Sequence, residues 1–425
     1  YIKMEGAGNP NFQNENPYNE MIFPDAGFRL LAVYRYWNMI QYFFPYKYQT
    51  DKDWNDVLKE YIPIFLSVEN RLEYELASIQ CIGEVCDTHA GLYDGRGAIE
   101  ESWGKYYAPF RVAFIEKKLV VVDYYNPEYK DTIGLEIGDI ITHINSESIE
   151  DIVERQRKYY PASNELARLR RMALNMVRST KDTINITLIG NDARIIPITK
   201  NIQLYESSSL DIYDLFHWYG IDDSGKSYRH IDDDIGYITL ASIQNEEIPI
   251  IREEFLDKKG IIIDIRNYPT SFMPFILGSY FVSEPTTFVK VTIGSINNPG
   301  EFSFRESAEI PDTGETFQGK LIVIVNEISQ SQAEWTAMAF RAGNNTTIIG
   351  STTAGADGNV SEIYLPGGLE TCISGIGVYY PDGTQTQRIG IVPDIWIEPT
   401  IEGIRQGRDE LLEKAIELIN GDNNE

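Results

Sequence analysis

The chain has 425 residues, of which 43% are hydrophobic, so it can bury a large core and form two or three domains. Its 37 Lys and Arg against 64 Asp and Glu give a net charge of −27, which repels nucleic acid and anionic membranes. We therefore expect no nucleic-acid partner. We also expect no membrane span, because no apolar run approaches the roughly 20 residues that a span needs.

The first 20 residues are rich in Asn, Gly and Pro, a composition that predicts an irregular arm. They begin YIKMEGAGNP, which is neither a signal peptide nor a start at an initiator methionine. We therefore expect the chain to begin within a longer precursor.

Three amphipathic stretches follow. FRLLAVYRYWNMIQYFFPY, DWNDVLKEYIPIFLSV and RLEYELASIQCIGEV carry apolar residues at spacings of three and four, and predict three helices, the first ending near Pro45. They define a helical domain over residues 1–105. Cys81 and Cys86 lack the CxxC spacing of a zinc site, and they are either a disulfide or two small buried residues.

Residues 106–200 alternate like strands around one basic helical stretch and predict a small β domain. Within it, GLEIGDIITHINSESI resembles the PDZ pattern through Gly134, Leu135, Gly138, Asp139 and Asn145. The resemblance implies peptide binding by addition of a strand to a sheet edge, and we assign Gly134 and Leu135 to it. A small β domain without a ligand is the alternative.

Residues 201–425 alternate strands with helices after a polar, acidic boundary between residues 200 and 232. GIIIDI and KLIVIV are continuous apolar runs, as strands covered on both faces require. This order predicts an α/β domain.

Two serines, Ser329 and Ser331, lie between the strand KLIVIV and the helical pattern AEWTAMAFR. A serine at a helix start lies beside free backbone N–H groups, which can hold an oxyanion. Ser331 and Glu334 also form an S-x-x-E capping box, so helix capping is the competing interpretation.

The order of motifs in residues 232–400 resembles the core of the C-terminal processing (tail-specific) serine peptidases and of the related tricorn protease. The matching residues are Asp264, Arg266, Asn267, Ser329, Ser331, Glu334, Gly350, Thr353, Gly355, Tyr380, Pro381, Gly383, Gly390, Ile391, Pro393 and Asp394. The resemblance implies a crotonase/ClpP-like core of stacked ββα units, preceded by the helical and PDZ-like domains. It also implies that Ser331 is the nucleophile.

The base must differ from the Lys of tail-specific peptidases, because Gly355 is followed by Ala356 and Asp357. The tricorn-like branch instead implies His89 as general base, with the Thr88 hydroxyl orienting its ring. The tricorn-like branch completes its site with a Glu near the Gly-x-x-Pro-Asp segment. The corresponding residue here is Gln387, whose amide supplies no charge to an imidazolium, and Asp87 is the alternative. We interpret the other histidines, at 143, 217 and 230, as structural.

The oxyanion hole also departs from the family. A Gly pair usually follows the Asp-x-Arg-Asn motif, but here Thr270 and Ser271 stand near that place. We predict the N–H of Gln332 as one donor and the second from Thr270 or Ser271.

The first interpretation is a serine endopeptidase that acts by acyl transfer on peptides or unfolded proteins, without a cofactor or metal. The second is a catalytically inactive peptide-binding scaffold of the same fold. Acyl-CoA chemistry is a third, which the acidic balance and the lack of a basic phosphate-binding cluster disfavour. The resemblance implies a periplasmic or cell-surface location.

Overall fold

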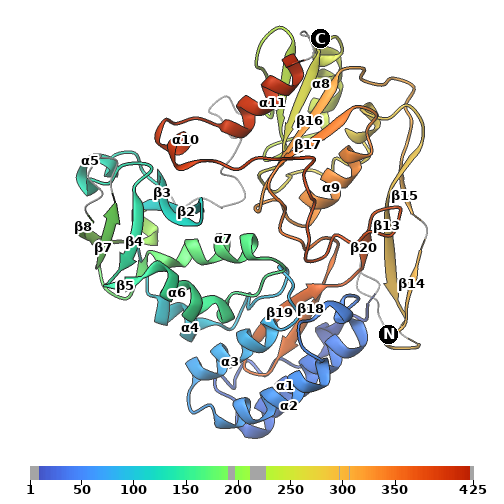
Figure 1. The fold of residues 1–425 in the computed structure, drawn as a ribbon. Coiled ribbons are helices and arrows are strands. Elements are labelled where there is room, and N and C mark those ends of the chain that lie inside the picture. Colours follow the sequence, from blue (N-terminus) through green and yellow to red (C-terminus); the bar gives the residue numbers. More distant parts are fainter. Residues whose placement is uncertain (1–8, 190–196, 211–225, 296, 306, 422–425) are drawn as a thin grey trace.

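The computed structural model describes residues 9–189, 197–210, 226–295, 297–305 and 307–421 (Figure 1). It is a mixed α/β structure, as predicted. None of the helices in these ranges is long and apolar enough to cross a membrane.

The predicted helices of the amino-terminal region are α1 (Ala26–Phe43), α2 (Trp54–Ser67) and α3 (Arg71–Gly83). The short α4 (Gly97–Trp103) follows them in the chain. The sequence sets their starts, because Asp25, Asp53 and Asn70 each accept hydrogen bonds from free backbone N–H groups at a helix start. The first helix ends two residues before Pro45, as predicted. Short 3₁₀ turns, η1 (Phe12–Asn14) and η2 (Lys47–Gln49), flank α1.

A distant hairpin completes the core of these helices. Strands β18 (Val360–Leu365) and β19 (Leu369–Ser374) pack Ile363, Leu365, Leu369 and Ile373 against them. Figure 1 shows the orange hairpin beside the blue helices. The consequence is that the end of β19, at Ser374, lies next to the loop that follows α3.

The middle of the chain forms an antiparallel sheet in the order β2-β3-β4-β7-β8. Its strands are β2 (Phe110–Ile115), β3 (Lys118–Tyr124), β4 (Ile140–Ile144), β7 (Thr183–Ile189) and β8 (Ile198–Gln203), with β5 (Glu147–Ser148) beside β4. The helices of this unit are α5 (Tyr129–Ile133), α6 (Ile149–Gln156) and α7 (Glu165–Met176). The short strands β1 (Tyr106–Tyr107), β6 (Arg178–Ser179) and β9 (Tyr205–Glu206) make a second sheet. In the described sheet, β2 is an edge strand that packs against α7.

The carboxy-terminal part is built on a six-stranded sheet in the order β10-β11-β12-β16-β17-β21. All its pairs are parallel except β10 with β11. The bounds are β10 (Tyr228–His230), β11 (Ile235–Thr239), β12 (Gly260–Asp264), β16 (Lys320–Val325), β17 (Thr346–Gly350) and β21 (Ile395–Trp396). The two apolar runs of the sequence are the central strands β12 and β16.

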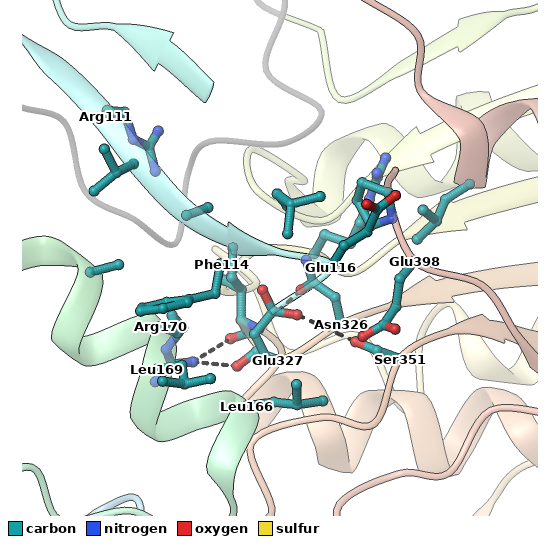
Figure 2. A pocket seen from close by; sticks show the side chains of 18 of the residues that line it. Arg111, Phe114, Glu116, Leu166, Leu169, Arg170, Asn326, Glu327, Ser351 and Glu398 are labelled. Atoms are coloured by element: carbon teal, nitrogen blue, oxygen red, sulfur yellow. Dashed lines mark hydrogen bonds between the residues drawn. The ribbon is translucent and has the colours of Figure 1, made fainter. Parts of the chain in front are cut away.

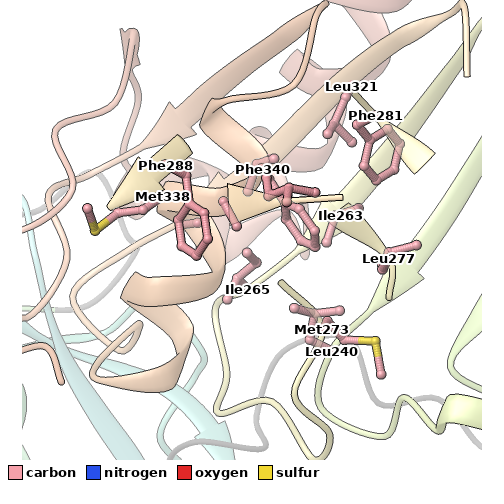
Figure 3. Close-up of a cluster of buried hydrophobic side chains, with 14 of the residues drawn as sticks. Leu240, Ile263, Ile265, Met273, Leu277, Phe281, Phe288, Leu321, Met338 and Phe340 are labelled. Carbon is pink, nitrogen blue, oxygen red and sulfur yellow. The ribbon is translucent and has the colours of Figure 1, made fainter. Parts of the chain in front are cut away.

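Successive side chains of these strands enter different cores, as a sheet covered on both faces requires. Ile261 and Ile263 join the cluster formed with α8 (Ile248–Phe255) and α9 (Gln332–Arg341), part of which Figure 3 shows. Ile262 joins Leu411 and other residues of α11 (Glu410–Asn420) on the opposite face. The short α10 (Ile401–Arg405) precedes α11.

A further sheet lies beside α9. It consists of β13 (Thr286–Gly294) with β14 (Phe302–Phe304), β15 (Ala308–Ile310) and β20 (Val378–Tyr379). β20 follows the hairpin β18–β19 in sequence, so this sheet links the main core to the helical region.

Candidate active site

Ser331 occupies the turn between the central strand β16 and the helix α9. Its backbone has φ 58° and ψ −118°, a conformation that costs a residue with a Cβ of order 1–3 kcal/mol. Such strain persists where the surrounding structure imposes it, and it clusters at functional sites. Ser331 is only partly buried, so its hydroxyl can meet a substrate.

The capping box predicted for Ser331 and Glu334 forms. In a capping box the serine oxygen accepts a backbone hydrogen bond, so its own O–H remains free for donation to a base. Capping and nucleophilic attack are therefore compatible at Ser331.

Ser329 has a different role. It is fully buried, its hydroxyl donates to the carbonyl of Ile265 at 2.6 Å, and it accepts from the N–H of Asn326 at 3.2 Å. Both hydrogen bonds fasten the turn to the neighbouring strand end. Ser329 is thus part of the support of the turn.

Glu334 fixes the turn from inside. Its buried carboxylate accepts from Thr353 Oγ1 at 2.5 Å, Gly355 N at 2.8 Å, Ala356 N at 3.0 Å and Ser331 N at 3.2 Å. Burial raises the pKa of Glu334, and these hydrogen bonds oppose that rise. Burial and the charge of Glu334 raise the pKa of the adjacent Asp357 well above its ordinary value.

The segment 354–356 connects the turn of Ser331 to the loop that carries His89. Ser331 N donates to Ala356 O at 2.9 Å, and Ala354 N donates to Ser329 O at 3.0 Å. The Thr88 hydroxyl donates to Ala354 O at 2.9 Å. Residues two apart along a chain lie within about 7 Å, so folding brings the loop of His89 and the turn of Ser331 to the same segment.

His89 follows α3 in a buried loop. Its Nδ1 lies 2.9 Å from Ser374 Oγ, and its Nε2 is buried with no hydrogen-bond partner in the described part of the chain. Burial lowers the pKa of His89, the charge of Asp87 opposes this, and the charge of Arg171 adds to it. The imidazole is therefore neutral at pH 7, as a general base must be.

Asp87 is fully buried and receives three donors. His89 N donates to its Oδ1 at 2.9 Å, Ser374 N to its Oδ2 at 2.7 Å, and Ser374 Oγ to its Oδ1 at 3.1 Å. The direct distance from Oδ1 to His89 Nδ1 is 3.9 Å, so Ser374 stands between the two groups. No sequence motif pointed to Ser374, which closes an ordinary strand.

The Thr88 hydroxyl, predicted to orient the imidazole, makes other contacts. It donates to Ala354 O and accepts from Ser163 N at 2.8 Å. Thr88 thus holds the loop, and the contact to the ring comes from Ser374.

Two adjacent arginines of α7 contact the turn of Ser331 and the loop of His89. Arg170 donates to Glu327 O at 2.5 Å and to Gln330 Oε1 at 2.9 Å, within the nucleophile turn. Arg171 donates to Ala90 O at 3.0 Å and to Thr88 O, on either side of His89. The sequence shows only a basic helix here, so these contacts were not predictable.

Figure 2 shows Arg170 beside the carbonyl oxygens of the turn, at the end of a small cavity between β2, α7 and the main sheet. The cavity has a volume of about 80 Å³ and is lined by Phe114, Leu169, Asn326, Glu327 and Ser351 among others. It is too small for a peptide strand.

The predicted oxyanion donors differ in whether their backbone N–H groups are already hydrogen-bonded. The Thr270 N–H donates to Leu240 O at 3.0 Å, so it is already engaged. The Ser271 carbonyl accepts from Gln332 Nε2 at 3.0 Å, which ties this loop to α9. Gln332 is the first residue of α9, where a backbone N–H has no partner within the helix. Gln332 N–H is the predicted donor that the geometry supports.

Gln387, the predicted third element, is buried. Neither its Oε1 nor its Nε2 has a hydrogen-bond partner among the described residues. The next residue, Arg388, has φ 66° and pairs with Asp51 at 2.7 Å. The side chain that contacts the His89 ring is therefore Ser374, and the Gln387 amide makes no such contact.

Gly134 and Leu135, assigned to peptide binding, follow α5. Gly134 ends α5 with φ 66°, and Leu135 is fully buried with its carbonyl accepting from Tyr124 Oη at 2.7 Å. In the described sheet the two edge strands are β2 and β8.

The remaining histidines make other contacts, and the cysteines are unpaired. His143 contacts Thr142 Oγ1 at 3.1 Å, and His230 contacts Glu254 Oε2 at 3.0 Å, while His217 is outside the described residues. Cys81 and Cys86 are buried free thiols, as one of the two interpretations held. Across the ranges that the structure describes, no cluster of three His, Cys, Asp or Glu could hold a metal.

A strained serine at a strand-to-helix turn is the arrangement in which serine-type hydrolases present a nucleophile. The model of peptidase family S41 matches residues 234–397. The segment 234–397 belongs to peptidase family S41, and the protein is a serine-type peptidase.

Solved structures share the fold. Mature CPAF complexed with lactacystin has a TM-score of 0.70 at 13% identity, covering 93% of this chain and 99% of that chain. A putative peptidase from Parabacteroides merdae has a TM-score of 0.56 at 17% identity, covering 93% of this chain and 97% of that chain. A comparison with curated proteins gave no match.

Proposed function

We propose that the protein is an endopeptidase that cleaves extended peptide chains by acyl transfer, with Ser331 as nucleophile and His89 as general base. One observation carries the proposal. The Ser331 N–H and the Thr88 hydroxyl both donate to carbonyl groups of the segment 354–356, which supports a short distance between the turn of Ser331 and the loop of His89.

In this mechanism the Ser331 Oγ–H proton passes to His89 Nε2 as Oγ bonds to the scissile carbonyl carbon. The carbonyl oxygen becomes an oxyanion that faces the start of α9, where the Gln332 N–H and the helix dipole favour negative charge. His89 then returns the proton to the leaving amine. Water repeats the sequence on the acyl-enzyme and releases Ser331.

The middle unit is proposed as a PDZ-like domain that presents the substrate. The outer edge of β2 is unpaired in the described sheet, and a peptide can add to such an edge as a further strand. The lining of the cavity by both β2 and the turn at residues 326–328 supports this role. Because the cavity holds only about 80 Å³, peptide entry requires β2 and α7 to separate from the main sheet.

The proposed substrates are peptides or unfolded proteins, and the proposed location is the periplasm or cell surface. Both rest on the resemblance to tail-specific peptidases described above. The negative charge of −27 favours substrates without an acidic excess.

The experiment is hydrolysis of an unfolded protein without an acidic excess, such as reduced lysozyme alkylated with iodoacetamide, by the wild type and by Ser331→Ala and His89→Ala. We expect cleavage by the wild type only, with the rate in both variants lower by about 10³-fold or more. Wild-type protein that binds this substrate without cleaving it would contradict the proposal. That outcome would favour a catalytically inactive peptide-binding scaffold of the same fold.

A further inference from the structure

We infer that Ser374 is a positioning residue whose hydroxyl connects His89 to Asp87 and sets the tautomer of the catalytic imidazole. This inference rests on the proposed role of His89. In this assignment two groups together take the place of the third catalytic residue. They are the Ser374 hydroxyl, at the end of the hairpin β18–β19, and the Asp87 carboxylate, in the loop that carries His89.

The direction of each hydrogen bond follows from the donors and acceptors present. The Asp87 carboxylate can only accept, and it already binds His89 N at 2.9 Å and Ser374 N at 2.7 Å. The Ser374 hydroxyl therefore donates its single proton to Asp87 Oδ1, 3.1 Å away, because a charged acceptor forms the stronger hydrogen bond.

This assignment leaves a lone pair of Ser374 Oγ facing His89 Nδ1 at 2.9 Å. Nδ1 must then carry the proton, and Nε2 carries the lone pair. Nε2 is the buried nitrogen without a partner in the described residues. The free nitrogen is thus the one that can accept the Ser331 proton.

The same contacts stabilise the charge that forms during attack. When Nε2 takes the Ser331 proton, the Nδ1–H bond to Ser374 remains, and no proton moves to Asp87. The carboxylate lies 3.9 Å from Nδ1 in a buried site, where its attraction for the imidazolium is strong. Gln387, an amide, cannot supply that charge.

The fold holds Ser374 in place independently of His89. Ser374 pairs with Val360 across the hairpin, and its own N–H is fixed by Asp87. The other groups facing His89 are Arg171 near the ring, and Cys372 and Tyr93, which both donate to the His89 carbonyl.

The test compares Ser374→Ala with Ser361→Ala, a buried serine on the neighbouring strand β18 whose hydroxyl accepts from Asn9 at 3.0 Å. We expect Ser374→Ala to lower kcat roughly 10- to 100-fold with little change in KM, because part of the general-base contribution is lost. The acid limb of its pH profile moves to lower pH, since the imidazolium loses an acceptor. Ser361→Ala keeps the wild-type profile.

A double-mutant cycle and a spectrum separate positioning from mere packing. Asp87→Asn and Ser374→Ala act through one contact, so the double variant is no slower than the slower single variant. The ¹⁵N spectrum of the wild-type His89 ring shows a protonated Nδ1 and an unprotonated Nε2. An unprotonated Nδ1 would overturn the inference, even if Ser374→Ala fails to fold.

Wild-type kcat and pH profile in Ser374→Ala, with His89→Ala inactive, would overturn the inference while leaving the proposed function intact. Full activity in His89→Ala would instead remove the proposed function itself. The two failures are therefore distinct.

Discussion

Ser329 and Ser331 lie two residues apart in one turn and have opposite physical situations. Ser329 is buried with its oxygen used as donor and acceptor, whereas Ser331 is partly exposed in a strained backbone conformation. Removing the first should harm stability, and removing the second should harm chemistry.

We predict that Ser329→Ala lowers the free energy of unfolding by about 1–3 kcal/mol, because the Asn326 N–H loses its acceptor in a buried site. Urea unfolding measures this, with Ser331→Ala as the matched variant. Ser331→Ala loses only the helix-cap hydrogen bond at the start of α9, which should cost about 1 kcal/mol. Equal stability of Ser329→Ala and the wild type would contradict the assignment.

The pH dependence follows from the environment of His89. Burial lowers its pKa below the ordinary 6.5, so the imidazole stays neutral, and active as a base, at lower pH than a free histidine. We predict that the acid limb of kcat/KM lies below pH 6.5. An acid limb above pH 6.5 would contradict a buried neutral base.

The same shift has a stability consequence with a definite sign. Below pH 6.5 the imidazole of residue 89 binds a proton in the unfolded chain, whereas in the folded protein it stays neutral to lower pH. The free energy of unfolding therefore falls as the pH decreases from 6.5. His89→Ala should lose this part of the pH dependence, which urea titrations at pH 5 and pH 8 would measure.

At the scale of elements, the strand pair β16–β17 supports the nucleophile turn. Gly350 ends β17 with φ 124°, and a Cβ there would lie 1.9 Å from the Val325 carbonyl oxygen. We predict that Gly350→Ala destabilises the fold by about 3 kcal/mol or more. The control is Gly383→Ala, with φ 94° and no atom within 4 Å, which should cost only about 1 kcal/mol of strain.

Thermal unfolding of the two variants makes the comparison. Equal losses in Gly350→Ala and Gly383→Ala would show that the close approach of β17 to Val325 does not govern stability.

Helix α7 contacts both the turn of Ser331 and the loop of His89. We predict that Arg170→Ala and Arg171→Ala each lower kcat roughly 10-fold or more, because a displacement of about 1 Å between reacting groups can cost 10²-fold. Arg168→Ala is the matched control. Arg168 lies on the same helix and donates to Tyr160 O at 2.8 Å, but it contacts neither loop. Steady-state kinetics on a peptide substrate measures kcat for all three variants. Equal kcat values in the three would contradict the role of α7.

At the scale of the whole molecule, the sequence predicted the α/β core and the amino-terminal helices. It did so because these features rest on local signals: continuous apolar runs for β12 and β16, and helical periodicity for α1 to α3. The prediction of Ser331 and His89 as catalytic residues rested on the order of motifs rather than on any local property of the two residues. In the structure the Ser331 N–H and the Thr88 hydroxyl, next to His89, both donate to the segment 354–356.

The contacts that could not be predicted are those made between distant segments. The hairpin β18–β19 completes the core of the helical region and carries Ser374 to His89, although 285 residues separate the two. Ser374 has no local signal, since a serine at a strand end is common. Likewise, nothing in the basic pattern of α7 shows which carbonyl groups Arg170 and Arg171 contact.

The central claim is that His89 activates Ser331, and phosphonylation by a fluorophosphonate probe measures it most directly. We predict that mass spectrometry finds one adduct per chain, on Ser331, with a rate that falls about 10²-fold or more in His89→Ala. An adduct on Ser329, no adduct in folded wild type, or an unchanged rate in His89→Ala would contradict the account.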